Sequence, residues 1–133
     1  MKTMNVVMIG TGDIAYSHGR AVVKLGGAVI AAFDVNRAGL EKYCAEFGSE
    51  ALSYEQLDEW IPKADYVVLC TPPTKRLDYV EKVLSAHVPL YMEKPIATTL
   101  EDAKKLKDME QKYDAKIIVG FAHRFRPAFV KMY

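Results

Sequence analysis

Short apolar runs alternate along the chain with longer stretches in which apolar side chains recur every three or four residues. The runs are rich in valine, isoleucine and alanine, and they lie at residues 6–9, 28–33, 66–70, 89–92 and 116–120. Runs of this length and composition are typical of strands that are buried on both faces of a parallel sheet. The pattern therefore predicts five central strands.

The stretches between these runs predict helices. Apolar side chains occur at helical spacing over residues 14–25, 40–47, 77–84 and 103–113. Glycine follows the first two stretches and can end their helices. Thr98 or Thr99 can cap the last of the four.

Two regions give a weaker pattern. Ala51 and Leu52 predict a brief edge strand, and residues 57–61 predict a short helix that Pro62 ends. Pro127 predicts the first turn of a further helix near the end of the sequence.

Strands and helices thus alternate from one end of the sequence to the other. Parallel strands need crossover connections, and these connections are almost always right-handed. We therefore predict an α/β fold, a doubly wound parallel sheet with helices on both faces. The 133 residues suit one domain, 1–133, and no internal linker or repeat divides them.

Charge and composition narrow the class of partner. Half of the residues are hydrophobic, and the net charge of +1 comes from interspersed acidic and basic residues. Because positive and negative charges are mixed along the chain, no surface of a single charge is expected to attract nucleic acid or a membrane. We therefore expect a small-molecule partner. Cys44 and Cys70 form no metal or disulfide pattern, and no signal peptide or long apolar run is present. We expect a cytoplasmic protein.

Residues 10–15, Gly-Thr-Gly-Asp-Ile-Ala, match the pattern G-x-G-x-x-G/A between a predicted strand and a predicted helix. In that context the first glycine permits a tight turn, the second admits a pyrophosphate, and Ala15 allows close packing of helix on strand. The start of the helix then offers free N–H groups to phosphate. The candidate phosphate-binding residues are Gly10, Thr11, Gly12, Asp13 and Ile14.

Asp34 follows the second predicted strand, where an acidic side chain can accept hydrogen bonds from the ribose hydroxyls of a dinucleotide. A carboxylate at this position would repel a 2′-phosphate, which favours NAD. Arg37 keeps NADP open, because its guanidinium could pair with that phosphate if the side chain turned inward.

Polar clusters follow three further strands, and ligands of open parallel sheets bind along that edge. The first cluster is Thr71-Pro72-Pro73, the second contains Glu93 and Lys94 ahead of a proline, and the third contains His123 and Arg124. Lys94 could donate a hydrogen bond to a substrate hydroxyl or carbonyl. A surface lysine in a loop is the alternative.

Four segments together resemble the Gfo/Idh/MocA oxidoreductase family in order and spacing. They are the glycine turn with His18, Cys-Thr-Pro-Pro at 70–73, Tyr-Met-Glu-Lys-Pro-Ile-Ala at 91–97, and Gly-Phe-Ala-His-Arg-Phe-Arg-Pro at 120–127. The last two are far more specific than the glycine turn alone. The resemblance covers essentially the whole chain, but only the amino-terminal NAD(P)-binding Rossmann domain of the family.

The resemblance implies hydride transfer between NAD(P) and a hydroxyl-bearing substrate, often a sugar, inositol or related polyol. It implies that Lys94 orients the reacting hydroxyl as the catalytic-site lysine. The residues that it implies around the nicotinamide riboside and its crevice are Cys70, Thr71, Pro72, Pro73, Glu93 and Arg124.

The chain departs from the family pattern in two respects. Arg76 stands at the third position after the Thr-Pro-Pro turn, where the family commonly has histidine. Family members also continue into a second α/β domain that supplies a catalytic aspartate and histidine, most of the substrate pocket and usually the oligomer interface. This sequence ends before such a domain, so we expect cofactor binding with little turnover, and a tendency to form homo-oligomers through exposed apolar surface.

Other functions stay open on the sequence alone. A non-catalytic module that senses NAD(H) or serves as an interaction domain would share the glycine turn, but it would not need Lys94. A flavin or S-adenosylmethionine site explains the segment Glu93–Pro95 less well. Among the histidines, His18 is expected to pack against the cofactor or its loop, His87 to be structural, and His123 to lie at the ligand edge.

Overall fold

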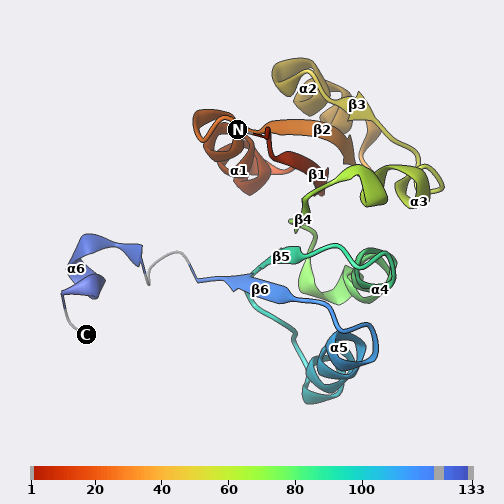
Figure 1. Ribbon diagram of the computed structural model, residues 1–133, viewed down its shortest axis with the longest axis vertical. Coiled ribbons are helices and arrows are strands. Elements are labelled where there is room, and N and C mark those ends of the chain that lie inside the picture. Colours follow the sequence, from red (N-terminus) through yellow and green to blue (C-terminus); the bar gives the residue numbers. More distant parts are fainter. Residues whose placement is uncertain (1, 122–124, 132–133) are drawn as a thin grey trace.

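The computed structural model describes residues 2–121 and 125–131 and shows a six-stranded sheet with helices on both faces (Figure 1). All strand pairs are parallel, and the strand order is β3-β2-β1-β4-β5-β6. The strands are β1 (Asn5–Ile9), β2 (Ala28–Phe33), β3 (Glu50–Ala51), β4 (Tyr66–Leu69), β5 (Leu90–Glu93) and β6 (Ile117–Gly120). The predicted doubly wound sheet is confirmed.

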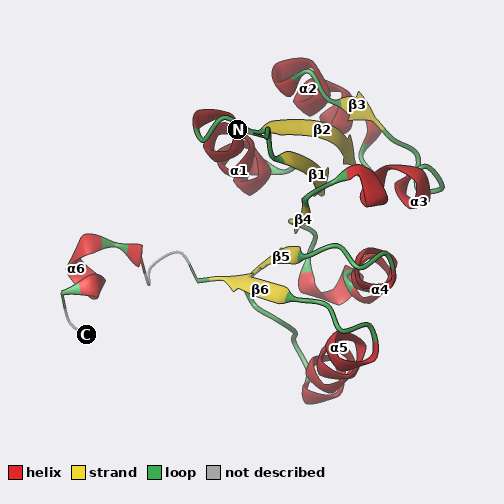
Figure 2. Ribbon diagram, viewed as in Figure 1, coloured by secondary structure: helices red, strands yellow, loops and turns green. Residues whose placement is uncertain are grey.

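Helices connect successive strands (Figure 2). They are α1 (Asp13–Lys24), α2 (Arg37–Phe47), α3 (Leu57–Trp60), α4 (Leu77–Ser85), α5 (Leu100–Lys112) and α6 (Pro127–Val130), with 3-10 turns η1 (Ile61–Lys63) and η2 (Pro73–Lys75). In one detail the expectation was wrong, because Pro62 does not end the short helix. It lies at the start of η1, where a missing backbone N–H costs no hydrogen bond.

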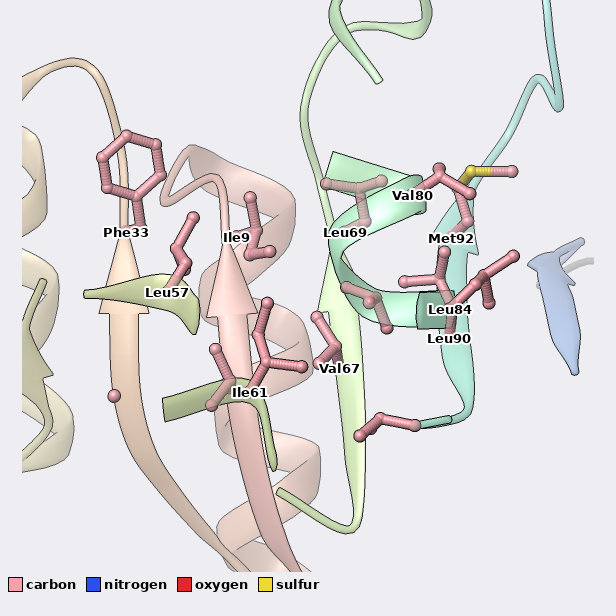
Figure 3. Close-up of a cluster of buried hydrophobic side chains, with 14 of the residues drawn as sticks. Ile9, Phe33, Leu57, Ile61, Val67, Leu69, Val80, Leu84, Leu90 and Met92 are labelled. Carbon is pink, nitrogen blue, oxygen red and sulfur yellow. The ribbon is translucent and has the colours of Figure 1, made fainter. Parts of the chain in front are cut away.

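Strand β1 lies at the centre of the sheet, and its side chains point alternately into two cores. Val7 and Ile9 belong to a core formed with α3, α4 and α5, whose middle is drawn in Figure 3. Val6 and Met8 belong to a second core formed with α1 and α2. All four side chains are completely buried, which explains why the strand is a continuous apolar run rather than an alternating one.

Close packing fixes helix α1 against α2. The Tyr43 hydroxyl donates a hydrogen bond of 3.0 Å to the Ala15 carbonyl, deep in the second core. Gly19 lies so close to α2 that a Cβ atom there would come within 2.5 Å of the Phe47 ring. Small residues along α1 therefore allow the two helices to approach, and this contact sets the direction in which α1 leaves the sheet.

Local capping agrees with the sequence. Asn36 caps α2 by accepting a hydrogen bond from the Gly39 N–H, and Gly48 ends the same helix in the left-handed conformation. Of the two predicted threonines it is Thr99 that caps α5, with its side chain accepting from the Asp102 N–H.

Helix α6 lies apart from the helices that cover the sheet (Figure 1). No helix within residues 2–121 and 125–131 is long and apolar enough to cross a membrane.

The turn after β1 passes through a very narrow space. Gly10 has a φ of +90°, and its N–H donates a hydrogen bond of 2.8 Å to the Phe33 carbonyl of β2. A Cβ atom on Gly10 would lie 2.9 Å from the carbonyl carbon of Cys70, which follows β4. Both the backbone conformation and the neighbouring backbone therefore require glycine here.

We predict that Gly10→Ala lowers the free energy of unfolding by more than about 2 kcal/mol, because it adds a backbone contact to the strain of a positive φ. Gly26→Ala is the matched control, since Gly26 has a φ of +82° but nothing within 4 Å of its Cβ position. Urea denaturation of both variants measures the difference. Equal destabilisation would show that the contact with the Cys70 backbone is unimportant.

Candidate functional site

The strand order creates a crevice at the carboxyl ends of β1 and β4. From β1 the chain proceeds outward to β2 and β3, and it then returns to the other side of β1 to form β4. The loops after β1 and β4 therefore run away from each other, and such a point is where open parallel sheets bind ligands. A pocket of about 690 Å³ lies there.

The pocket brings together seven of the predicted site residues: Gly10, Thr11, Gly12, Asp34, Cys70, Thr71 and Pro72. They come from the loops after three adjacent strands of the sheet, β2, β1 and β4.

Gly12 lines the pocket and leaves free space beside the start of α1. It caps α1 with an ordinary extended backbone conformation, φ −72° and ψ −172°, and no side chain caps the helix there. A Cβ atom on Gly12 would meet nothing within 4 Å, so neither the backbone conformation nor the packing of the described residues requires glycine at this position. The missing side chain instead leaves room for a ligand next to the first N–H groups of α1, which attract phosphate.

The Asp34 carboxylate fastens the glycine turn to the end of β2. Its Oδ2 atom accepts hydrogen bonds from the Thr11 N–H, at 2.7 Å, and from the Thr11 hydroxyl, at 2.9 Å. Its Oδ1 atom accepts from the Asn36 N–H at 2.8 Å. The predicted ribose-binding acid therefore lines the pocket with its orientation already fixed by three hydrogen bonds.

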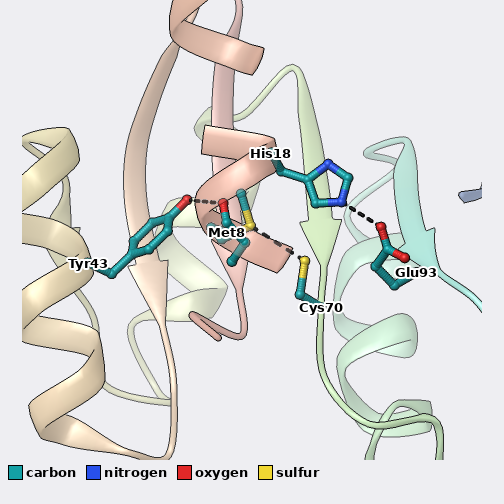
Figure 4. A network of polar contacts seen from close by, with 6 residues as sticks. Met8, His18, Tyr43, Cys70 and Glu93 are labelled. Atoms are coloured by element: carbon teal, nitrogen blue, oxygen red, sulfur yellow. Dashed lines mark hydrogen bonds and ion pairs between the residues drawn. The ribbon is translucent and has the colours of Figure 1, made fainter. Parts of the chain in front are cut away.

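The loop after β4 forms the opposite wall. The Cys70 N–H donates to the Ile9 carbonyl at 2.7 Å, and the Cys70 Sγ atom lies 3.9 Å from the sulfur of Met8 (Figure 4). Burial raises the pKa of the Cys70 thiol to about 12, so the thiol is neutral at physiological pH. The Thr71 Oγ1 atom is buried and has no hydrogen-bond partner within the described part of the chain.

Glu93 ends β5 and contacts His18 of α1. The His18 Nε2 atom lies 2.6 Å from Glu93 Oε1, and both side chains are largely buried (Figure 4). The His18 ring also packs edge-on against Tyr91, with ring centroids 5.1 Å apart. The sequence suggested a cofactor role for Glu93 and packing for His18 but not their pairing, because no local pattern links residues so far apart in the chain.

The remaining predicted residues lie outside the pocket lining. Asp13 and Ile14 are exposed in the first turn of α1, and Lys94 is exposed beyond the end of β5. Pro73 begins η2. Arg37 points along α2, where its Nε atom donates to Glu41 Oε1 at 2.9 Å.

His123 and Arg124 lie outside the described residues.

Sequence reasoning missed one side of the pocket, which is largely aromatic. Phe33, Tyr54 and Tyr79 line it, and their ring centroids are 6.0 Å apart in each pair. Lys75 and Asp78 complete this side. Tyr54 lies in a loop and Tyr79 in a helix that the apolar pattern explained as core, so nothing local indicated that the three rings meet.

Arg76 is the other residue that the sequence left unexplained. Its side chain is only 2% exposed, and it lies between the loops that follow β4 and β5. Burial lowers the pKa of its guanidinium, while the nearby Glu93 carboxylate acts in the opposite direction. The ordinary pKa is so high that the group keeps its charge at neutral pH.

These residues fit a dinucleotide. The open Cα of Gly12 and the start of α1 suit a pyrophosphate, and Asp34 suits the hydroxyls of an adjacent ribose. The buried Thr71 hydroxyl, which has no partner among the described residues, adds a polar group on the opposite wall.

Two curated enzymes illustrate what the chain is similar to. It is 33% identical over 135 residues to the inositol 2-dehydrogenase of Paracoccus denitrificans, an alignment that covers 98% of this chain and 40% of that protein. It is 28% identical over 119 residues to the glucose-6-phosphate 3-dehydrogenase of Bacillus subtilis, covering 89% of this chain and 33% of that enzyme. The chain thus spans about 40% or less of the length of these relatives.

Solved structures show the same fold. The scyllo-inositol dehydrogenase of Lactobacillus casei, determined with NAD(H) and scyllo-inositol, superposes with a TM-score of 0.85 at 24% identity, over 98% of this chain and 40% of that one. At this identity the likeness establishes the fold alone.

A family model described as an oxidoreductase family with an NAD-binding Rossmann fold matches residues 4–121. This match covers all six strands and every pocket residue named above. The chain therefore belongs to the Gfo/Idh/MocA family of oxidoreductases and forms its NAD-binding Rossmann domain.

Proposed function

We propose that these residues bind NAD for a dehydrogenase that oxidises a hydroxyl group of an inositol, a sugar or a related polyol. The observation that carries the proposal is the open space at Gly12, directly beside the first N–H groups of α1. The two curated relatives, an inositol 2-dehydrogenase and a glucose-6-phosphate 3-dehydrogenase, support the substrate class.

The sheet order gives the dinucleotide a direction. Its pyrophosphate would lie over Gly12, and its adenosine ribose would face Asp34 at the end of β2. The nicotinamide half would then extend to the other side of β1, along Thr71 and Pro72 and toward the end of β5. Bound NAD supplies the hydride acceptor.

Lys94 is the residue that we assign to the reacting hydroxyl. It follows Glu93 directly, at the end of β5 where the nicotinamide half would lie, and its side chain is exposed. An ammonium group there can donate a hydrogen bond to the substrate oxygen and hold it in one orientation. Because the chain spans about 40% of the inositol 2-dehydrogenase relative, we expect cofactor binding but little turnover from these residues alone.

The preference for NAD over NADP rests on Asp34. A 2′-phosphate would enter beside a carboxylate that three hydrogen bonds hold in place. Arg37, which could counter that repulsion, is paired with Glu41 outside the pocket. Both observations favour the cofactor without the additional phosphate.

We predict that Gly12→Val weakens NADH binding at least about tenfold, because its methyl groups take the space of the pyrophosphate. The fold should survive, since the new Cβ atom would meet nothing within 4 Å beyond its immediate neighbours in the chain. Calorimetric titration measures the affinity, and circular dichroism checks the fold. Lys24→Val, which adds a branched side chain at the far end of α1, is the control. Unchanged NADH affinity in folded Gly12→Val would contradict the proposed binding mode.

We predict that Asp34→Asn shifts the ratio of NADPH to NADH affinity toward NADPH on the order of tenfold, because it removes the charge facing the ribose. Asp108→Asn makes the same chemical change at an exposed position of α5 and serves as the control. Parallel titrations of both variants with the two nucleotides give the ratio. If Asp108→Asn changed the ratio as much as Asp34→Asn, the preference would reflect overall charge rather than Asp34.

A further inference from the structure

Arg76 precedes α4 and is the most deeply buried charged side chain among the described residues, with 2% of its surface exposed. Arginine side chains are rarely buried unless their donors are paired. The proposed chemistry assigns no role to Arg76, so its burial needs a separate explanation.

The contacts of Arg76 join two loops of the site. Its Nε atom donates a hydrogen bond of 3.1 Å to the Thr71 carbonyl, in the loop that forms a wall of the pocket. Its Nη1 atom donates to the Pro95 carbonyl, in the loop that follows β5. One side chain thus links the wall beside Thr71 to the residue after Lys94.

A third group, the Glu93 carboxylate, lies close enough for its charge to favour the charged guanidinium. Glu93 is in turn held by His18 at 2.6 Å. Arg76 therefore has a carbonyl acceptor in each loop and a negative charge nearby, a combination that compensates the burial of its own charge.

Arginine suits this position better than lysine or histidine. The guanidinium is a planar fork with five donors, so it can bond two carbonyl groups that lie in different directions. A lysine ammonium is a compact group that is more strongly hydrated, and an imidazole has only two ring nitrogens. The guanidinium of Arg76 can therefore donate hydrogen bonds to both carbonyls at once.

We propose that Arg76 is a positioning residue for the nicotinamide half of the site. By bonding the loops after β4 and β5 together, it sets the distance between the wall at Thr71 and the loop that carries Lys94. The inference rests on the proposed function, and it confines the effect of Arg76 to one half of the dinucleotide. Within the described residues its hydrogen bonds go to Thr71 and Pro95 and not to Gly12 or Asp34, which would hold the other half.

The test compares two ligands that differ only in the nicotinamide. Titration of the 133-residue chain with NADH and with ADP-ribose gives the affinity with and without the nicotinamide ring. In Arg76→Lys we expect NADH affinity to fall on the order of tenfold, and ADP-ribose affinity to stay within about twofold. Arg20→Lys, on an exposed arginine of α1, is the matched control.

Chemical rescue separates positioning from a general loss of packing. We expect guanidinium chloride at low, non-denaturing concentration to restore NADH affinity to Arg76→Ala, whereas sodium chloride at equal ionic strength should not. If Arg76→Ala fails to fold, Arg76→Lys still allows the comparison between ligands, because it keeps the charge and much of the length.

The possible outcomes are distinct. An equal fall in both affinities in Arg76→Lys, or no fall in either, would overturn the positioning role while leaving the proposed function intact. If the unmodified chain binds neither ligand, the proposed function fails and this inference fails with it. A selective loss of NADH affinity supports both.

Discussion

The chain leaves β1 between two strands that already occupy both of its edges. The Gly10 N–H donates to β2, its Cα lies against the backbone that follows β4, and the next residue, Thr11, donates two hydrogen bonds to Asp34. The turn therefore has one available path, and α1 begins where that path ends. The proposed phosphate site depends on this path of the turn, because the path decides where the first N–H groups of α1 point.

The same confinement explains why much of the architecture follows from local sequence. A strand buried on both faces must be apolar at every position, so the runs at β1 and β4 are recognisable without knowledge of their neighbours. The turn between β1 and α1 needs glycine at one position for steric reasons and has open space beside a second glycine. Both requirements are local, and the sequence displays both.

Other features could not be predicted, because they depend on contacts between segments distant in the chain. The pairing of His18 with Glu93 joins α1, which follows β1, to the end of β5, and β4 lies between these two strands in the sheet. The burial of Arg76 contradicts the usual behaviour of arginine, and it becomes understandable only when the Thr71 and Pro95 carbonyls are found on either side. The aromatic side of the pocket likewise assembles from residues that local patterns assign to a loop and to core packing.

The three hydrogen bonds to the Asp34 carboxylate have a thermodynamic consequence. A free aspartate would lose rotational entropy whenever a ribose bound to it, and that loss would weaken every encounter. Here the side chain is already immobilised by the Thr11 and Asn36 backbone, so the loss occurs once, during folding. Oδ2 already accepts two hydrogen bonds, whereas Oδ1 accepts one and can still accept another. In the proposed binding mode the ligand would therefore meet a rigid acceptor, and selectivity at this position would come from repelling the wrong nucleotide rather than from adapting to the right one.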